Sequence, residues 1–306
     1  MKNKLLLKTV YAIFTVFTIA FLFSSCKSGG SEREVEEPVA ITEINEEVLQ
    51  DVKEAERIFY SLPSPLESAM LIKSAGARFN EELLNSTDNT TRYATNKQKA
   101  LNLGIYTCDL SFSSLYDQTQ LVIEYMSAAK EMADGLGILD AINEETINKL
   151  EENVNNRDVI MDIVSETFLN SNSYLEENEQ PAIASMVLVG GWVEGLYIAT
   201  QLVDMDEFDS DKLVGRIIDQ KLSIDIMMQL LKDNNEHPAV PSIIEQMAEL
   251  KAVFDKINIK TTDVKPEFDE TTNVTVLKST VETDMTPEVF MELAGKVEEI
   301  RSSYVK

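Results

Sequence analysis

The segment from Ala182 to Val203 constrains the fold of this chain more than any other. It holds 22 residues (AIASMVLVGGWVEGLYIATQLV), of which only Glu194 is charged. A helix of this length and apolarity is long enough to cross a bilayer. A helix that is apolar on all sides is equally typical of the centre of a large helical bundle.

Three features of this segment favour the centre of a bundle over a membrane. Glu194 lies near the middle of the segment, where a charge is costly in a bilayer. Three glycines, Gly190, Gly191 and Gly195, weaken an isolated helix but allow neighbouring helices to approach closely. The flanks carry acids and no Lys or Arg that would fix an orientation in a membrane. We therefore expect a buried central helix.

A carboxylate inside such a helix needs a partner. Without one, its pKa shifts or the fold is destabilised. Two aromatic residues flank the acid, so Trp192, Glu194 and Tyr197 form a candidate ligand-binding site that could line a small-molecule pocket. The alternative is that Glu194 is a core acid satisfied by another part of the protein.

Apolar residues recur at three- and four-residue steps along most of the chain, the spacing of an amphipathic helix. One example is the stripe from Phe290 through Val297 and Ile300 to Tyr304, which follows a Thr286-Pro287-Glu288 start signal. The fold class predicted from this pattern is all-α, a multi-helix bundle. We expect helices near residues 44–61, 65–75, 78–85, 94–116, 118–136, 143–170, 181–203, 210–233, 240–257 and 287–304.

One stretch lacks a helical stripe. Residues 261–284 are rich in Thr and Val, which is typical of extended structure. We expect a short extended, hairpin-like excursion near residues 268–283, with a long irregular connection as the alternative.

The first 25 residues have the three parts of a secretory signal peptide. A basic start is followed by the uncharged run from Thr9 to Phe23, and then by the small pair Ser24 and Ser25 before Cys26. The sequence Phe-Ser-Ser-Cys resembles a lipobox, and we predict lipidation of Cys26, which would hold the chain on a membrane. An ordinary cleaved signal and an uncleaved anchor helix are the alternatives. The predicted domains are a signal peptide over 1–25, a flexible acidic tether over 26–43 and one helical domain over 44–306.

The formal net charge is −26. Nucleic acid is excluded as a partner, because phosphates are bound by Lys and Arg clusters. The partners that we predict are the membrane, through the lipid on Cys26, and envelope proteins.

Residue types that carry common chemistries are scarce. His237 is the only histidine and lies in a predicted turn. Zinc sites of the HExxH or two-cysteine type are therefore excluded, and a nucleophile–histidine pair would have to use His237. Four acids at 204, 206, 209 and 211 fail the calcium-loop pattern and are better explained as a loop that caps the following helix, which we expect Asp209 to open. Cys108 lies in an apolar stretch and is expected to be buried. We predict no enzymatic activity, no catalytic or metal-binding residues and no cofactor.

Three segments carry a resemblance to a known group of proteins. They are Tyr60–Glu67 (YSLPSPLE), Lys99–Tyr106 (KALNLGIY) and Lys130–Gly137 (KEMADGLG). They resemble segments of outer-membrane lipoproteins from Bacteroidota that have no assigned activity. The resemblance implies an outer-membrane location. Since Lys27-Ser28-Gly29-Gly30 separate Cys26 from the first acid, the periplasmic face is favoured over the cell surface.

Three functions are compatible with these observations. The leading one is a non-enzymatic envelope lipoprotein that acts through a protein or small-ligand interface. The second is a ligand-binding or sensing bundle with a pocket around Trp192, Glu194 and Tyr197. The third is a carboxylate-based hydrolase, which would need two acids that converge in a cleft.

Overall fold

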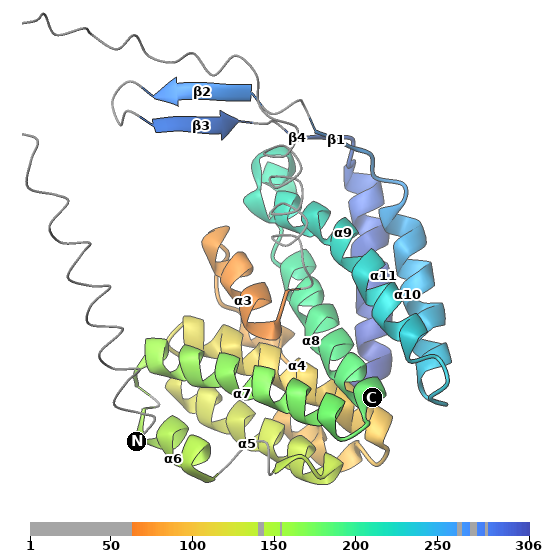
Figure 1. Cartoon of the computed structure of the whole chain (residues 1–306). Coiled ribbons are helices and arrows are strands. Elements are labelled where there is room, and N and C mark those ends of the chain that lie inside the picture. The colour runs from red at the N-terminus through yellow and green to blue at the C-terminus, as the bar shows by residue number, and fades with distance from the viewer. Residues whose placement is uncertain (1–62, 140–143, 154, 262–264, 270–273, 279–280) are drawn as a thin grey trace, which may run out of the picture. The chain divides into compact units, whose positions relative to one another are not determined.

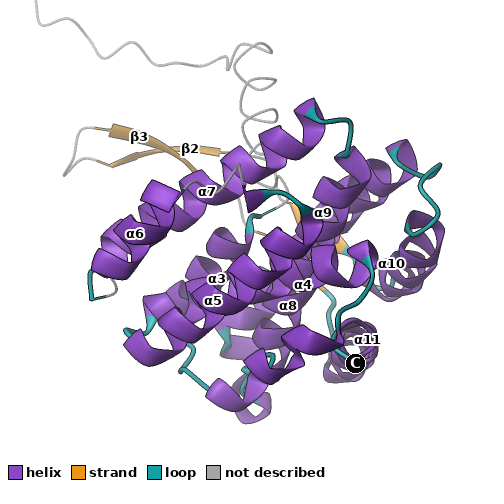
Figure 2. Ribbon diagram, turned by 90° about the horizontal axis from the view of Figure 1, so that it is seen from below, coloured by secondary structure: helices purple, strands orange, loops and turns teal. Residues whose placement is uncertain are grey.

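The computed structural model describes residues 63–139, 144–153, 155–261, 265–269, 274–278 and 281–306, and most of these are helical (Figures 1 and 2). The all-α multi-helix bundle predicted from the sequence is confirmed. The predicted signal peptide over 1–25, Cys26, the tether over 26–43 and the helix over 44–61 lie outside the described residues.

Two long helices form the centre of the bundle. They are α4 (Asn96–Leu115) and α8 (Pro181–Gln201), and most residues of both are buried. Within the described part of the chain, α8 is the one helix long and apolar enough to cross a membrane, and 89% of its apolar window is buried inside the protein. The prediction of a buried central helix is therefore confirmed.

Glycines allow these two helices to touch backbone to backbone. A Cβ atom added at Gly190 would lie 1.9 Å from the carbonyl oxygen of Leu101, and one added at Gly104 would lie 2.0 Å from the carbonyl oxygen of Val187. No side chain fits into such a space, so the distance between α4 and α8 is set by residues without a side chain.

The remaining helices pack around this pair. On one side of the pair, α5 and α7 both pack on α4, and α6 packs on α7. On the other side, α9 and α11 pack on α8, and α10 packs on α9 and α11 (Figures 1 and 2). The helix α3 contacts both central helices. Their bounds are α3 Pro65–Ser74, α5 Thr119–Leu136, α6 Glu144–Glu152, α7 Arg157–Glu177, α9 Lys212–Asp233, α10 Val240–Phe254 and α11 Pro287–Tyr304.

Local sequence signals begin several of these helices. Ser64 and Glu67 form a reciprocal capping box at the start of α3, and Thr95 and Gln98 do the same for α4. The start of α11 matches its prediction, because the Thr286 side chain caps the helix and a proline follows at its first position.

Two pairs of short antiparallel strands lie between α10 and α11. Strand β1 (Ile259–Thr261) pairs with β4 (Val281–Thr283), and β2 (Lys265–Asp269) pairs with β3 (Val274–Lys278). The predicted extended, hairpin-like excursion in this part of the chain is confirmed.

Three predictions about helix boundaries were wrong. The single helix expected over 143–170 is two helices, α6 and α7. Asn156 directly precedes α7, and its side chain caps that helix by accepting a hydrogen bond from the Val159 N–H. The helix expected over 78–85 is only the 3₁₀ turn η1 (Glu81–Leu83). The residue that caps α9 is Asp211 and not Asp209, which lies in the 3₁₀ helix η4 (Met205–Ser210).

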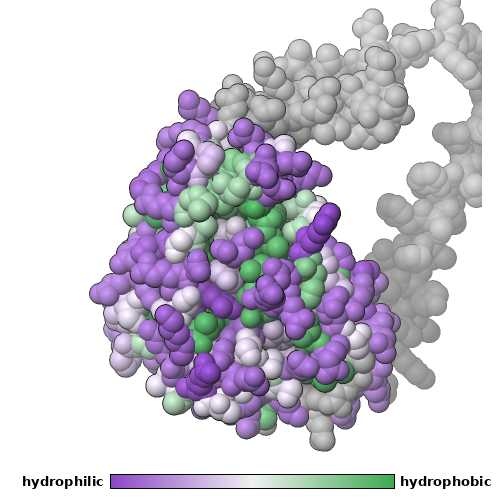
Figure 3. Space-filling view, turned by 180° about the vertical axis from the view of Figure 1, so that it is seen from behind, coloured by the Kyte–Doolittle hydropathy of each residue, from purple (hydrophilic) through white to green (hydrophobic). Residues whose placement is uncertain are grey.

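The outer surface carries the acidic excess of the composition. On the face drawn in Figure 3, hydrophilic side chains surround smaller hydrophobic areas. Among the described residues, the large apolar side chains that are exposed are few: Met70, Ile123, Met205, Leu222, Ile226 and Met291, of which Leu222 and Ile226 both belong to α9.

Substitution of Gly190 by alanine should test the contact between α4 and α8. We expect the new methyl group to force the backbones apart and to lower the free energy of unfolding by about 1–3 kcal/mol or more. Gly215→Ala in α9 is the matched control, since no atom lies within 4 Å of its added Cβ. That control should stabilise the protein by about 0.5–1 kcal/mol through helix propensity. Urea denaturation measures both, and equal stabilities of the two variants would contradict the close contact.

Candidate functional site

The three residues predicted to form a pocket all lie on α8, but they do not face the same way. Successive helical residues are rotated by about 100°, so Trp192 and Glu194 point to nearly opposite sides. Trp192 is buried and its Nε1–H donates a hydrogen bond of 2.9 Å to Gln220 Oε1 on α9. The structure brings together Glu194 and Tyr197 and leaves Trp192 apart from them.

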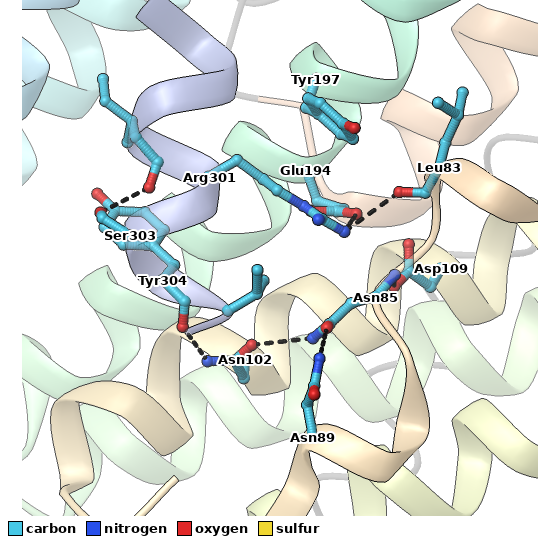
Figure 4. A network of polar contacts seen from close by, with 12 residues as sticks. Leu83, Asn85, Asn89, Asn102, Asp109, Glu194, Tyr197, Arg301, Ser303 and Tyr304 are labelled. Carbon is cyan, nitrogen blue, oxygen red and sulfur yellow. Dashed lines mark hydrogen bonds and ion pairs between the residues drawn. The ribbon is translucent and has the colours of Figure 1, made fainter. Parts of the chain in front are cut away.

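Arg301 of α11 joins Glu194 and Tyr197 (Figure 4). Its Nε and Nη2 donate to the two carboxylate oxygens of Glu194, each at 2.9 Å, in a bidentate ion pair. The guanidinium carbon also lies 4.7 Å from the centre of the Tyr197 ring, a cation–π distance. The Glu194 side chain is fully buried, whereas 12% of the Arg301 side chain is exposed. Glu194 is thus a core acid with a protein partner.

A second buried acid lies beside this ion pair. Asp109 of α4 is fully buried, and one of its oxygens, Oδ2, accepts a hydrogen bond of 3.1 Å from the Asn85 N–H. Burial raises the pKa of Asp109 well above its usual value, the Glu194 carboxylate raises it further, and Arg301 lowers it only in part. The protonated form of Asp109 is therefore favoured in the folded chain, and with Asp109 protonated the cluster holds one negative and one positive charge.

A network of amide side chains extends from these acids to the end of the chain (Figure 4). Asn85 donates from Nδ2 to Asn102 Oδ1 at 3.1 Å, and Asn102 donates to the Tyr304 carbonyl at 2.8 Å. Arg301 also donates to the Leu83 carbonyl at 3.2 Å. The network therefore connects the segment after α3, the central helix α4 and the terminal helix α11.

Arg301 and Asp109 were absent from the prediction. A signal for Arg301 was present in the sequence, because it follows Val297 by four residues and so lies on the same face of α11 as the apolar stripe. A positive charge on a buried face calls for a buried acid. Asp109 gave a similar signal, since it lies in an otherwise apolar and hydroxyl-bearing part of α4.

A cavity of about 300 Å³ lies elsewhere, among helices α4 to α8. Helices α5 and α7 both pack on α4 but scarcely contact each other, and the cavity occupies the space between them. Helix α5 contributes Ile123, Met126, Ser127, Ala129 and Lys130 to its lining. Helix α7 contributes Val164, Thr167, Phe168, Ser171 and Leu175.

The deeper part of this cavity is formed by the central helices. Leu103, Thr107 and Leu110 of α4 lie there with Ala184 and Val187 of α8, and all five are buried. A second cavity of about 160 Å³ lies beside the start of α3 and shares the lining residues Thr107, Val164 and Phe168 with the first, so the two are neighbours. Pockets that bind small molecules have volumes of about 300–1,000 Å³ and are mostly apolar with a few polar groups. The α5–α7 cavity meets that description.

Other residues singled out in the sequence have structural roles. Cys108 is fully buried, as predicted, and burial raises the pKa of its thiol well above the usual value, with Asp109 and Glu194 adding to the effect. His237 lies in the turn between α9 and α10, where its Nδ1 accepts a hydrogen bond from the Ala239 N–H at 3.3 Å. In the acidic loop, Asp211 accepts hydrogen bonds from the N–H groups of Asp204 and Leu213, both at 2.8 Å, which confirms that this loop caps α9.

Comparisons of the chain with protein-family models, with curated proteins and with solved structures found no match. No activity and no binding residue can therefore be transferred from a relative. The resemblance to Bacteroidota lipoproteins stays a prediction.

The proton on Asp109 makes a pH-dependent contribution to stability that can be measured. Because its pKa is raised in the folded chain, Asp109 holds its proton up to a higher pH there than in the unfolded chain, which releases it above about pH 4. The free energy of unfolding should therefore fall as the pH rises from 4 towards the raised pKa, by up to about 1.4 kcal/mol per pH unit from this group. Asp109→Asn keeps the shape of the protonated acid and should remove that part of the slope.

Urea denaturation of both proteins between about pH 4.5 and pH 7.5 measures the difference in slope. The exposed Asp162→Asn, on α7, is the control and should leave the slope unchanged. Parallel curves for wild type and Asp109→Asn would show that Asp109 is ionised in the folded chain.

Proposed function

We propose that this protein is a lipid-anchored, non-enzymatic binding protein of the bacterial envelope that holds an apolar small molecule in the α5–α7 cavity. The observation that carries the proposal is the cavity itself, which has a volume of about 300 Å³ and a lining dominated by apolar side chains. The proposal moves the ligand site from the pocket predicted around Trp192, Glu194 and Tyr197 to a different face of the central helices.

The ion pair supports this change of site. Because Glu194 already has Arg301 as a bidentate partner, a ligand there would have to displace an internal contact. Removal of one partner of a buried ion pair typically costs about 3–5 kcal/mol. The small cavity beside Trp192 has a volume of only about 20 Å³, which holds about one water molecule. The α5–α7 cavity can be filled without displacing a charged group.

The lining also indicates what kind of molecule would bind. Apolar side chains offer no directional bonds, so affinity for this cavity should grow with the buried apolar area of the ligand. Each buried methylene contributes about 0.8 kcal/mol. An aliphatic chain therefore suits this cavity, whose lining offers mainly apolar contacts.

A series of linear alcohols tests the proposed binding. For each added methylene the dissociation constant should fall about fourfold, until the cavity is filled and the constant levels off. Ala184→Phe places a ring in the cavity and should weaken binding of the longer alcohols at least about tenfold. Titration calorimetry of the full chain measures both effects.

Leu222→Phe is the matched control for the alcohol series. Leu222 is 46% exposed on α9 and does not line the cavity, so the same aromatic side chain at this position should leave binding unchanged. Thermal unfolding of Ala184→Phe should occur at or above the wild-type temperature, because the ring fills empty space. Equal binding by Ala184→Phe and wild type, with the fold intact, would refute the cavity as the site.

The proposed anchor is Cys26. The support for it is the order of a basic start, an uncharged apolar run and two small residues before this cysteine. An outer-membrane location with the periplasmic face favoured is proposed on the resemblance to Bacteroidota lipoproteins. Two or three acyl chains on one cysteine would retain an otherwise acidic domain at a membrane.

Cys26→Ser tests the anchor. The variant should move from the membrane fraction to the soluble fraction of cell lysates, because no acyl chain could be attached. Immunoblots of the two fractions measure the change, with Cys108→Ser as the control that keeps the membrane association. Persistence of Cys26→Ser in the membrane fraction would contradict lipidation as the means of attachment.

A further inference from the structure

Among the described residues that line the α5–α7 cavity, Lys130 is the only one with a charged side chain. Its position is notable in a chain with a net charge of −26, in which 53 acidic residues stand against 27 basic ones. We infer that the ligand of this cavity is a single-chain amphiphile with an anionic head group, which pairs with Lys130 while its aliphatic chain lies in the cavity. This inference rests on the proposed function and names the class of ligand.

The rim of the cavity lies along one face of α5. Ile123, Ser127 and Lys130 are spaced by four and three residues, and all three are exposed while they also line the cavity. Ile123 and Lys130 are separated by two helical turns, about 10 Å. The rim therefore has an apolar end and a positively charged end, an arrangement that matches a molecule with a polar head and an apolar chain.

The ammonium group of Lys130 is available to a ligand. No ion pair or hydrogen bond joins it to any described side chain, and this includes Asp134, which follows it by one turn on α5. Lysine side chains extend along apolar surface and keep the charged end in water. Lys130 can therefore pair with an anion at the rim without leaving the surface of the cavity.

Hydroxyl groups within the cavity add polar contacts without adding charge. Thr167 and Ser171 are separated by one turn on α7 and both line the cavity, and neither hydroxyl has a hydrogen-bond partner among the described residues. Each can donate to or accept from a ligand oxygen. Among the described residues, no acid lines the α5–α7 cavity, and Glu67 belongs to the lining of the separate cavity beside the start of α3. A cationic amphiphile, by contrast, would meet Lys130 as a like charge.

Three probes with the same aliphatic chain separate head-group recognition from binding of the chain. They are dodecanoate, dodecanol and dodecyltrimethylammonium, each titrated into the full chain below the concentration at which it aggregates. We expect dodecanoate to bind about three- to tenfold more tightly than dodecanol and the cation to bind most weakly. Added salt should reduce the advantage of dodecanoate, because the pair lies at an exposed rim.

Lys130→Gln should remove the difference between dodecanoate and dodecanol and leave the affinity for dodecanol unchanged. Lys232→Gln, the same change at an exposed position on α9 outside the cavity, is the matched control and should preserve the difference. Equal binding of all three probes to the wild type, or a difference that survives Lys130→Gln, would overturn the inference while the proposed function stands. If none of the three probes binds, both the proposed function and this inference are overturned.

Discussion

The contact between α4 and α8 is the constraint on which the rest of the bundle depends. Gly104 and Gly190 bring the two backbones so close that a single methyl group would collide with a carbonyl oxygen. Two helices in such contact bury nearly all of their surface between themselves and their neighbours, which explains why α8 can be apolar on every side without a membrane. The flanking helices then need only one apolar stripe each, because each covers one face of the central pair.

The same burial makes the charges in the core expensive and explains how they are arranged. Glu194 is taken out of water by its position on α8, and Arg301 supplies the charge and both hydrogen bonds that it requires. A second ionised acid would leave the cluster with a net negative charge in a region of low dielectric constant, and this raises the pKa of Asp109 and favours its protonated form. Because Arg301 belongs to the terminal helix, this pair also fixes α11 against α8. An apolar contact would attach α11 less specifically, since it has no direction.

The sequence alone was sufficient for the fold class and most helix positions, and insufficient for the contacts between helices. Periodicity and capping residues depend on neighbours within four positions, and both α8 and α11 were predicted from them. One predicted helix is divided into two at Asn156, whose side chain caps the second helix. The spacing of the apolar residues gave no sign of this cap. The partner of Glu194 lies 107 residues away, so local patterns could indicate that a partner was needed but not which residue it was. The cavity could not be predicted from the sequence for the same reason, because it is a space between five helices.

The α5–α7 cavity contrasts with the dense packing at the centre, and that contrast is the argument for function. Helices α5 and α7 both pack on α4, yet within the described part of the chain a space lined mainly by apolar side chains remains between them. Each Å² of apolar surface that stays accessible to water fails to contribute about 25 cal/mol to the free energy of folding. A few larger residues at positions such as Ala129 or Ala184 would close the space. Elsewhere in the protein, the backbone of Leu101 lies in direct contact with Gly190, so the sequence does achieve dense packing between helices. The open space between α5 and α7 is therefore better explained by an occupant than by poor packing.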